Sequence, residues 1–451
     1  MLDELIRAVG PDHVVRPAPA EYLTDATARG LHGSALAVVR PADAAEAARV
    51  VAACYRNDID ITPRGGGSGV AGGAVPDGGV VISLERLNRV RSFDPLVWRI
   101  QVEAGVTTGR LHQVARESGL MFPPDPGASE QSQIGGNLAT NAGGPHAFRY
   151  GVTRRWVTGI EAVIAPGELI TVGGPVRKDV AGYDLVGLLV GSEGTLGLIT
   201  AAWLRLVPAP EAVHVVAGVY STDVAACAAI ERILGSGIEA AAIELLDAAA
   251  MRFGGGGFPA ETADGALVLA EADGDTLEAA ARRDALLEVV ADGACWAQEV
   301  DDREAVWRWR DGVSSRLAAA HGGKLSEDIV VPLDRLAEMV AAVPLIGERH
   351  GLTGLSFGHA GDGNLHSSFL LDPADATQFA AAQAAVQELF DLTLEMDGSI
   401  SGEHGLGSVK AGFLAEQWGP AAVAAHEAVK RALDPAGLFN PGRKTAVVSP
   451  P

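Results

Sequence analysis

The sequence predicts an α+β protein with more than one domain, and three features support this prediction. Its 451 residues exceed what one hydrophobic core usually organises. Short apolar strands separated by glycine turns dominate the chain to about residue 210. After that point, Ala-rich amphipathic helices alternate with strands. We therefore expect three parts, which are residues 1–210, 211–396 and 397–451.

The composition restricts the partners that the protein can have. Hydrophobic residues make up 48% of the chain, which allows a large core, and the formal net charge of −22 argues against nucleic acid or an anionic membrane surface as the main partner. Cys54, Cys227 and Cys295 are far apart, so we expect neither a disulfide framework nor an iron–sulfur cluster. No signal-peptide pattern and no transmembrane segment is apparent, so we expect a soluble cytoplasmic protein.

In the first part, helix and strand patterns alternate. Ala44–Arg56 has the periodicity of an amphipathic helix and lies between strands expected at Ala35–Val39 and Ile59–Thr62. These elements indicate an α+β domain. Further strands are expected at Val80–Leu84, Arg99–Val102, Ile160–Ile164 and Leu188–Val190.

The second part has the alternation of a ferredoxin-like sheet with helices on one face. Its helices are expected at Thr222–Leu234 and Thr276–Ala291. Its strands are expected at Val213–Tyr220, Ile238–Leu245 and Ala266–Ala272. The third part contains a helix near Ala421–Leu433 and then a turn at 438–444.

Residues 61–73 form a glycine-rich loop that matches GxGxxG at Gly67, Gly69 and Gly72. A Rossmann dinucleotide site needs a helix directly after this loop, whereas Pro76 and an expected strand from Val80 follow here. NAD binding is therefore rejected. The loop is then either a phosphate cradle, in which Arg64 or Ser68 could add a donor, or a tight turn without a ligand.

Two further glycine loops favour the ligand over the bare turn. Residues 132–144 contain two pairs of glycines together with Asn137 and Asn141, whose side-chain amides suit a flavin or ribityl edge. Residues 191–197, Gly-Ser-Glu-Gly-Thr-Leu-Gly, form the third loop. Three such loops in one domain are hard to explain as turns alone.

The loops Arg64-Gly-Gly-Gly-Ser-Gly, Ile134-Gly-Gly-Asn with Asn141-Ala-Gly-Gly, Arg149-Tyr-Gly and Gly191-Ser-Glu-Gly-Thr-Leu-Gly together resemble the FAD domain of the vanillyl-alcohol-oxidase/PCMH superfamily. The resemblance implies that the loop at 65–69 holds the FAD pyrophosphate and that the later loops bracket the ribityl chain and the flavin ring. Ser68 stands near the place where some members tether flavin through His, so non-covalent FAD is implied. The implied cofactor-binding residues are Arg64, Gly65, Gly66, Gly67, Ser68, Gly69, Pro126, Gly127, Ser132, Gly135, Gly136, Asn137, Asn141, Gly143, Gly144, Tyr150, Gly151, Glu193, Gly194, Ile199 and Asn440.

A second motif, Phe357-Gly-His-Ala-Gly-Asp-Gly-Asn-Leu-His-Ser, places two histidines around a turn. Strands expected at 352–357 and 365–371 flank Gly-Asp-Gly-Asn, which is a strong hairpin signal. Cross-strand neighbours lie about 5 Å apart at Cβ, so His359 and His366 could share one metal ion. Glu403 is the candidate third ligand, which leaves His404 for proton transfer. The alternative is that these histidines are ordinary polar residues.

The segments 358–366 and 401–407 resemble the signature pair of the FAD-linked D-2-hydroxyacid dehydrogenases, which act on D-lactate, D-2-hydroxyglutarate or glycolate. The resemblance implies that His359, His366 and Glu403 bind a divalent metal, most readily Zn, with Mn or Fe as alternatives, and that His404 is the general base. It also implies that the substrate carboxylate meets Arg310, with Ser314 and Lys324 as further substrate-binding residues. Ser368 stands where members that oxidise dicarboxylates often have Asn, which disfavours 2-hydroxyglutarate.

The resemblance covers nearly the whole chain and implies a complete architecture. A PCMH-type FAD-binding domain is followed by a ferredoxin-like substrate (cap) domain, and the C-terminal segment returns to the FAD domain to complete the active site. The implied reaction is metal-assisted hydride transfer from a D-2-hydroxy acid to flavin N5. Electrons would leave to a separate acceptor, which is an electron-transfer flavoprotein, a quinone system or an iron–sulfur subunit. The alternatives are a non-redox FAD enzyme similar to alkyl-glycerone-phosphate synthase and a non-catalytic FAD-binding subunit of a glycolate oxidase-type complex.

Overall fold

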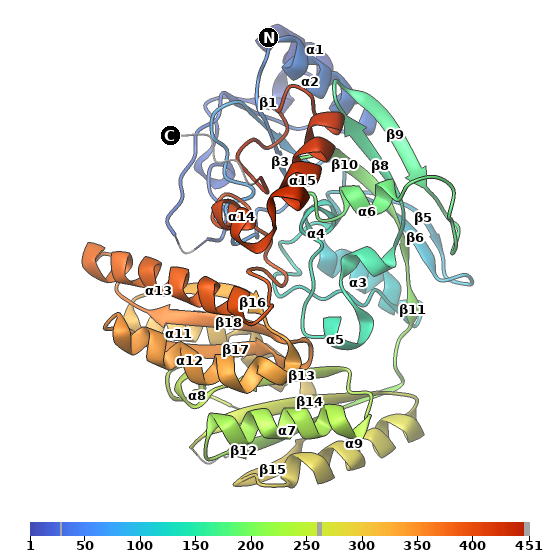
Figure 1. The fold of residues 1–451 in the computed structure, drawn as a ribbon. Coiled ribbons are helices and arrows are strands. Elements are labelled where there is room, and N and C mark those ends of the chain that lie inside the picture. The colour runs from blue at the N-terminus through green and yellow to red at the C-terminus, as the bar shows by residue number, and fades with distance from the viewer. Residues whose placement is uncertain (28, 259–263, 446–451) are drawn as a thin grey trace. The chain divides into compact units, whose positions relative to one another are not determined.

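The computed structural model describes residues 1–27, 29–258 and 264–445, so the last six residues of the expected segment 397–451 lie outside the described chain. The chain divides into two compact units. The first comprises Met1–Gly143, Gly151–Ala209 and Glu403–Pro451, and the second comprises Gly144–Tyr150 and Pro210–Gly402 (Figure 1). No helix in the described part of the chain combines the length and the apolar character that crossing a membrane requires.

The first unit contains a four-stranded sheet with the order β1-β2-β4-β3. Strands β2, β4 and β3 run parallel, and β1 pairs antiparallel with β2. Helix α1 (Leu2–Val9) packs on helix α2 (Ala44–Arg56), and both helices contribute to one apolar core with β3 and β4. The strands are β1 (Val14–Val15), β2 (Ala37–Val39), β3 (Ile61–Arg64) and β4 (Val80–Ser83).

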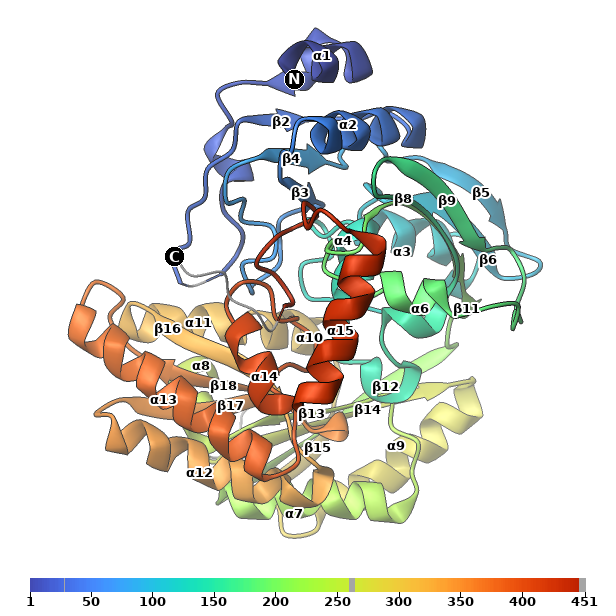
Figure 2. The ribbon, with the colours of Figure 1, turned by 45° about the horizontal axis from the view of Figure 1, so that its top comes forward.

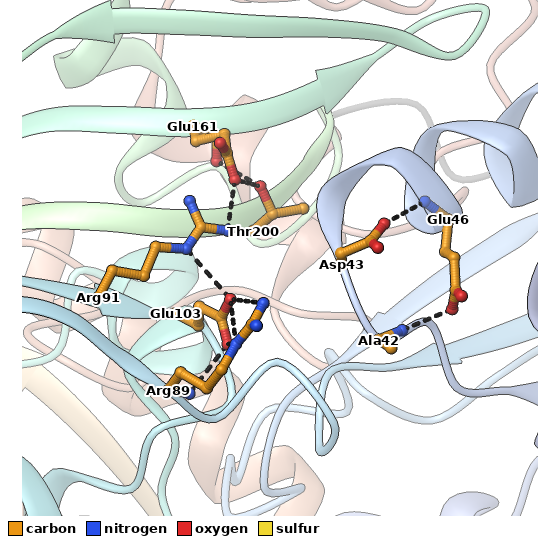
Figure 3. Close-up of polar contacts among 8 residues, drawn as sticks. All are labelled: Ala42, Asp43, Glu46, Arg89, Arg91, Glu103, Glu161 and Thr200. Carbon is orange, nitrogen blue, oxygen red and sulfur yellow. Dashed lines mark hydrogen bonds and ion pairs between the residues drawn. The ribbon is translucent and has the colours of Figure 1, made fainter.

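Helix α2 has the bounds that its periodicity predicts. Two side-chain hydrogen bonds cap its N-terminus. The carboxylate of Asp43 accepts a hydrogen bond from the Glu46 amide at 2.7 Å, and the Glu46 carboxylate accepts one from the Ala42 amide at 2.7 Å (Figure 3). These bonds satisfy amides that the helix itself leaves without partners. The apolar side chains that the helix buries include Ala47, Val50, Val51 and Cys54, at helical spacing.

The loop between β3 and β4 carries no helix or strand in the structure. The strand β4 is the next regular element after the glycine-rich residues 65–69. A Rossmann site would place a helix N-terminus directly behind this loop, so the structure confirms the rejection of a dinucleotide Rossmann fold.

A second sheet of the first unit has five antiparallel strands in the order β5-β6-β10-β8-β9. They are β5 (Val90–Asp94), β6 (Arg99–Glu103), β8 (Val157–Ile164), β9 (Glu168–Gly173) and β10 (Leu198–Arg205). A two-stranded pair joins β7 (Leu120–Met121) and β11 (Val207–Pro208). The helices of this unit also include α3 (Thr108–Arg116), α4 (Ile134–Thr140), α6 (Leu185–Leu189), α14 (Leu414–Gln417) and α15 (Pro420–Leu433).

The strand expected at Leu188–Val190 is wrong, because helix α6 covers Leu185–Leu189. The Asp184 carboxylate accepts a hydrogen bond from the Gly187 amide at 2.7 Å and so caps the start of this helix. A short run of apolar residues fits a buried strand and a short helix equally well, and here the cap decides between them.

The C-terminal segment returns to the small sheet of the first unit. Phe439 forms a parallel bridge with Ile61, whose amide donates to the Leu438 carbonyl at 2.8 Å and whose carbonyl accepts from the Asn440 amide at 2.7 Å. The ammonium of Lys430 in α15 donates to the carbonyls of Thr195 and Phe439. The C-terminal segment therefore extends the sheet at the strand that leads into the first glycine loop.

The second unit is built on a seven-stranded antiparallel sheet with the order β15-β12-β14-β13-β17-β18-β16 (Figure 2). The strands expected at 213–220 and 266–272 are present as β12 and β14, whereas the strand expected at 238–245 begins only at Ala242, as β13. The full set is β12 (Ala212–Tyr220), β13 (Ala242–Leu246), β14 (Ala266–Gly274), β15 (Trp296–Val300), β16 (Lys324–Val330), β17 (Thr353–His359) and β18 (Asn364–Leu370).

Helices cover both faces of this sheet, which corrects the expectation of helices on one face. One face is covered by α7 (Asp223–Ser236), α9 (Thr276–Ala291), α12 (Leu336–Arg349) and α13 (Ala376–Glu395). The short helices α8 (Ala248–Gly254), α10 (Arg303–Asp311) and α11 (Val313–His321) bury an apolar core on the other face. This second face carries large apolar side chains such as Leu246, Leu269 and Phe357, and the three helices shield these side chains from water.

The segment Gly144–Tyr150 belongs to the second unit although it lies between two parts of the first unit in sequence. It contains helix α5 (Ala147–Tyr150). Its side chains bind carboxylates of β14, since His146 contacts Glu271 at 2.7 Å and the hydroxyl of Tyr150 donates to Asp273. Three side-chain contacts, including that of Arg149 with Asp273, therefore fix this segment to the sheet.

Candidate active site

The first glycine loop has backbone amides that are available to bind a ligand. Within the described chain, the amides of residues 65–69 donate a hydrogen bond to no other group. The loop also packs closely on the second glycine loop, since a Cβ added at Gly66 would lie 1.9 Å from the Gln131 carbonyl oxygen. Consecutive free amides without side chains form a concave anion-binding surface. The arrangement therefore fits a pyrophosphate.

Arg64 supports this loop through its side chain. Its guanidinium is buried and donates to the backbone carbonyls of Glu21, Thr24 and Ala74 at 2.6–3.1 Å. A Cβ added at Gly67, which has φ +69°, would lie 2.1 Å from an Arg64 nitrogen, so the loop closes tightly around the side chain. The Arg64 guanidinium therefore binds the protein backbone, and the backbone amides of residues 65–69 are the groups available for an anion.

The second loop places its polar side chains in an internal network. The Asn137 amide donates to the Thr108 hydroxyl at 2.7 Å, and that hydroxyl lies 2.7 Å from the hydroxyl of Ser132. Asn141 ends helix α4 in the left-handed conformation, with its side-chain oxygen accepting from the Arg154 amide at 2.8 Å. At least part of each asparagine amide therefore stabilises the loop, whereas we expected these groups to face the flavin.

The third loop and the C-terminal turn are joined through Glu193 and Asn440. The Glu193 carboxylate accepts from the amides of Leu406 and Gly407 at 2.9 and 2.6 Å. The Asn440 side-chain amide donates to the carbonyls of Gly73 and Glu193 at 2.9 and 2.8 Å. Both residues are buried. They therefore hold four segments of the first unit together, at residues 73, 193, 406–407 and 440.

Of the buried side-chain atoms of the first unit that have no hydrogen-bond partner in the described chain, three lie in segments near the predicted cofactor site. They are Oε1 of Gln133, Oγ of Ser192 and Oδ1 of Asn440. Each belongs to one of the segments predicted to contact the flavin, and an unsatisfied buried acceptor costs about 1–3 kcal/mol. The edge of a flavin ring offers N–H donors and carbonyl acceptors that suit such atoms. The donor set therefore fits FAD, and Gln133 and Ser192 are additions to the predicted residues.

Most of the other predicted cofactor-binding residues lie in loops and turns, whereas Gly135 and Gly136 lie in α4, Tyr150 in α5 and Ile199 in β10. Gly194 and Gly151 have positive φ values of 70° and 76°, a conformation that favours glycine. Ile199 is buried in β10. Gly144 and Tyr150 belong to the second unit. The remaining residues lie in the first unit and are Gly65, Gly66, Gly67, Ser68, Gly69, Pro126, Gly127, Gly135, Gly136 and Gly143.

The two histidines of the second motif lie on a hairpin, as predicted. Strands β17 and β18 pair His359 with Asn364 and Phe357 with His366, so the histidines are diagonal neighbours on one face of the sheet. Their ring centroids are 5.3 Å apart. Gly363 closes the turn with φ +77°, and a Cβ there would lie 2.2 Å from the Val331 carbonyl. Both histidines are buried.

The histidines and Glu403 form a group that could hold a metal ion. The ligand atoms of His359, His366 and Glu403 all lie within 4.8 Å of one another. Glu403 directly follows Gly402, whose amide donates to the Asp328 carboxylate of β16 at 2.6 Å. Nε2 of the next residue, His404, lies 3.7 Å from the Glu403 carboxylate. Two imidazoles and one carboxylate are a common ligand set of catalytic zinc.

Glu244 is a central residue of this face that the sequence analysis missed. It lies in β13 and is fully buried. One of its oxygens contacts Nδ1 of His359, and the other accepts from Nε of Arg310 at 2.5 Å. Burial alone would raise the pKa of the Glu244 carboxyl, but the neighbouring Arg310 and His359 lower it to about 2. A single acidic residue inside an apolar strand was the signal in the sequence.

Two cations border the ring of Phe357 on the same face. The Arg310 guanidinium carbon lies 5.2 Å from the ring centroid and the Lys324 nitrogen lies 5.1 Å from it. Burial and the nearby Arg310 lower the pKa of Lys324 to about 8. One guanidinium nitrogen of Arg310, Nη2, is buried without a partner in the described residues. Ser314 is exposed in the first turn of α11, apart from this pair.

The sequence matches two family models. Residues 209–443 match the family described as "FAD linked oxidases, C-terminal domain". Residues 35–173 match the family described as "FAD binding domain". The descriptions of both models indicate that FAD is the cofactor.

Three named relatives are similar over most of their length. Glycolate oxidase subunit GlcD of Bacillus subtilis is 33% identical over 98% of this chain and 96% of that protein. A D-2-hydroxyglutarate dehydrogenase of Xanthomonas citri is 34% identical over 95% of this chain and 93% of that protein. A D-lactate dehydrogenase of Anaerostipes hadrus is 34% identical over 88% of this chain and 87% of that protein.

Among solved structures, p-cresol methylhydroxylase with substrate bound has a TM-score of 0.80 to this chain. The likeness covers 98% of this chain and 96% of that chain at 17% sequence identity. At this identity it concerns the fold alone, and it confirms the predicted PCMH-type fold.

Proposed function

Because the chain belongs to the family of FAD-linked oxidases, we propose that it is an FAD-dependent dehydrogenase that oxidises a D-2-hydroxy acid to the 2-oxo acid with a divalent metal. The enzyme class follows from relatives that are named as dehydrogenases of D-lactate and of D-2-hydroxyglutarate. The metal, the substrate and the residue roles are parts of the proposal.

The observation that carries the proposal is the arrangement on one face of the seven-stranded sheet. The ligand atoms of His359, His366 and Glu403 lie within 4.8 Å of one another. Glu244 connects the first of these histidines to Arg310, which has a buried nitrogen without a partner among the described residues. A 2-hydroxy acid has a hydroxyl and a carboxylate on adjacent carbons, which suits a metal beside a guanidinium.

In the proposed reaction, each residue has a defined task. His359, His366 and Glu403 would hold the metal, which supplies Lewis acidity toward the substrate hydroxyl. Arg310 binds the carboxylate, and Lys324 adds a second positive charge. His404 takes the hydroxyl proton. Bound FAD supplies the acceptor for the hydride from C2, so the substrate loses one hydride and one proton and becomes the 2-oxo acid.

The substrate is a small D-2-hydroxy acid in this proposal. The two serines Ser326 and Ser368 pair across β16 and β18, with hydroxyls 2.8 Å apart, and the Lys324 nitrogen lies 3.5 Å from Ser368. Ser368 stands where relatives that oxidise dicarboxylates often have Asn, so we favour D-lactate or glycolate over a dicarboxylate. Electrons would pass to a separate acceptor, namely an electron-transfer flavoprotein, a quinone system or an iron–sulfur subunit, and the cytoplasmic location stays a prediction.

The test is an anaerobic titration of the purified holoprotein. The flavin spectrum is recorded before and after addition of D-lactate, L-lactate, glycolate, D-2-hydroxyglutarate and D-malate. We expect bleaching by a D-acid or glycolate and none by L-lactate. A flavin band that no acid bleaches in metal-loaded protein would contradict the proposal and favour a non-redox FAD enzyme or a non-catalytic subunit.

A further inference from the structure

We propose that Glu244 is a positioning residue, which orients the metal ligand His359 and the substrate-binding Arg310 at the same time. The inference rests on the proposed function and extends it to a residue that contacts neither metal nor substrate. In this proposal one buried carboxylate orients both a metal ligand and a substrate-binding side chain.

Glu244 is built into the rigid centre of the second unit. Its strand β13 pairs with β14, where Glu244 lies opposite Leu269, and with β17, where Leu245 lies opposite Gly358. The neighbouring side chains Ile243 and Leu245 are buried in the core. A carboxylate is rarely placed in such surroundings without partners. Both oxygens of Glu244 are in fact occupied, one by each of the two residues that it orients.

The contact with His359 determines which ring nitrogen can bind a metal. A carboxylate only accepts hydrogen bonds, so Nδ1 of His359 must carry the proton in its contact with Glu244. The lone pair is then on Nε2, at the other side of the ring. A carboxylate behind a metal-ligating histidine fixes the ring orientation and raises its basicity. Glu244 thus prepares His359 as an Nε2 ligand.

The contact with Arg310 determines which edge of the guanidinium is free. Nε of Arg310 donates to Glu244 at 2.5 Å, whereas Nη2 is buried without a partner in the described residues. The Phe357 ring lies below the guanidinium at 5.2 Å. These two contacts hold the guanidinium, and its terminal nitrogens can face a carboxylate. Without Glu244 the guanidinium would lose its anchor and its charge compensation.

The same face contains a second buried carboxylate that serves as a matched control. Glu271 lies in β14, opposite Ala242 of β13, and Ala242 is two residues before Glu244 in the same strand. Glu271 is also buried. It accepts from Trp307 at 2.6 Å, one helical turn before Arg310 in α10. Glu244 and Glu271 thus both fix α10 to the sheet. In the described contacts only Glu244 also binds a predicted metal ligand.

The first experiment measures Zn²⁺ affinity rather than activity. Metal-free protein with FAD bound is titrated with Zn²⁺ in competition with a fluorescent chelator, for the wild type, Glu244→Gln and Glu271→Gln. We expect Glu244→Gln to weaken Zn²⁺ binding by about 10-fold to 100-fold, the usual effect of losing such a supporting group. Glu271→Gln should bind like the wild type. Equal affinity in wild type and Glu244→Gln, or equal weakening in both variants, would overturn the inference.

With saturating metal, steady-state kinetics test the second contact. Glu244→Gln should raise KM for the hydroxy acid, since one of the two carboxylate oxygens that bind Arg310 and His359 is lost. Glu271→Gln should leave KM unchanged, because the glutamine oxygen can still accept from Trp307 and keep α10 in place. A variant that lowers kcat while KM stays at the wild-type value would contradict the positioning of Arg310.

A third measurement uses only the wild type and so does not depend on the folding of a variant. Nitrogen-15 NMR of histidine-labelled metal-free protein, with His359 assigned through His359→Gln, should show the Nδ1–H tautomer. A proton on Nε2 would overturn the inference. If the wild type takes up no Zn²⁺, the proposed metal chemistry fails, and the tautomer still decides whether Glu244 orients His359.

Discussion

The side-chain amide of Asn440 donates to the backbone carbonyl of Glu193 at 2.8 Å, which joins the C-terminal turn to the third glycine loop. The same amide donates to Gly73 at the end of the first loop. Oδ1 of Asn440 is buried and has no partner in the described chain. One side chain therefore connects two predicted cofactor loops and offers its remaining acceptor to a ligand.

From this relationship we predict that Asn440→Ala weakens FAD binding. The change removes both donor contacts and the free acceptor, and one to two lost buried hydrogen bonds of about 1–1.5 kcal/mol each correspond to about a 10-fold to 100-fold change in affinity. The positive φ of 44° adds strain for alanine. Fluorescence titration of apoprotein with FAD measures the effect. Asn88→Ala, at an exposed asparagine, is the control, and equal affinities of the two variants would contradict the prediction.

We predict that His404→Ala lowers kcat by about 10²-fold to 10⁴-fold, the usual contribution of a general base. Because His404 is not among the three predicted metal ligands, bound Zn²⁺ and FAD should stay at wild-type levels. Metal analysis and the flavin spectrum check this alongside the turnover of the hydroxy acid. His32→Ala, at an exposed histidine of the first unit, should keep full activity. Full turnover in His404→Ala would contradict the role of His404 as the general base.

The lowered pKa of Lys324 leads us to predict that substrate binding depends on pH. Burial and the nearby Arg310 lower its pKa to about 8, so the ammonium is lost as pH rises through about 8. Its attraction for an anionic substrate is then present below this pH and absent above it. We expect kcat/KM to fall above about pH 8 in the wild type. In Lys324→Arg the charge persists, so this fall should disappear, and its persistence would show that another group titrates.

The sequence alone predicts the elements that depend on local chemistry. The helices at 44–56 and 276–291 have the predicted bounds because they are long, amphipathic and capped by Asp43 and Asp275. The hairpin with His359 and His366 follows from its Gly-Asp-Gly-Asn turn. Such signals lie within a few residues of the element that they determine.

What the sequence could not predict depends on contacts between distant residues. Glu244 meets His359 and Arg310 only because β13 lies beside β17 and α10 packs on that face, and nothing local specifies this order. Asn137 and Asn141 looked suited to a flavin, whereas part of each amide binds the protein itself. The short helices α8, α10 and α11 are too brief for a clear periodicity, so the covered second face was missed.

A last prediction concerns the stability of the first unit and its buried Glu103. Figure 3 shows that the carboxylate lies between Arg89 and Arg91, and that Arg91 also contacts Glu161. The contacts of the carboxylate with Arg89 and Arg91 measure 2.8 and 3.1 Å. Glu103 is fully buried in strand β6, so its charge depends on these partners. Burial raises the pKa of this carboxyl, but hydrogen bonds from Arg89 and Arg91 outweigh burial and lower it.

Because the folded-state pKa of Glu103 is lowered, its contribution to stability is present above the unfolded pKa of about 4.3 and is lost as pH falls through the folded value. We expect Glu103→Gln to destabilise the first unit at pH 7 by about 1–3 kcal/mol, because Arg89 and Arg91 lose the buried carboxylate that they bind. Arg91 still has its ion pair with Glu161. The difference from wild type should shrink as pH falls below about 4. Thermal unfolding followed by flavin fluorescence measures both effects. Glu168→Gln, at an exposed carboxylate of β9, should change little, and a Glu103→Gln penalty that stays constant down to the acid limit would contradict the assigned charge state.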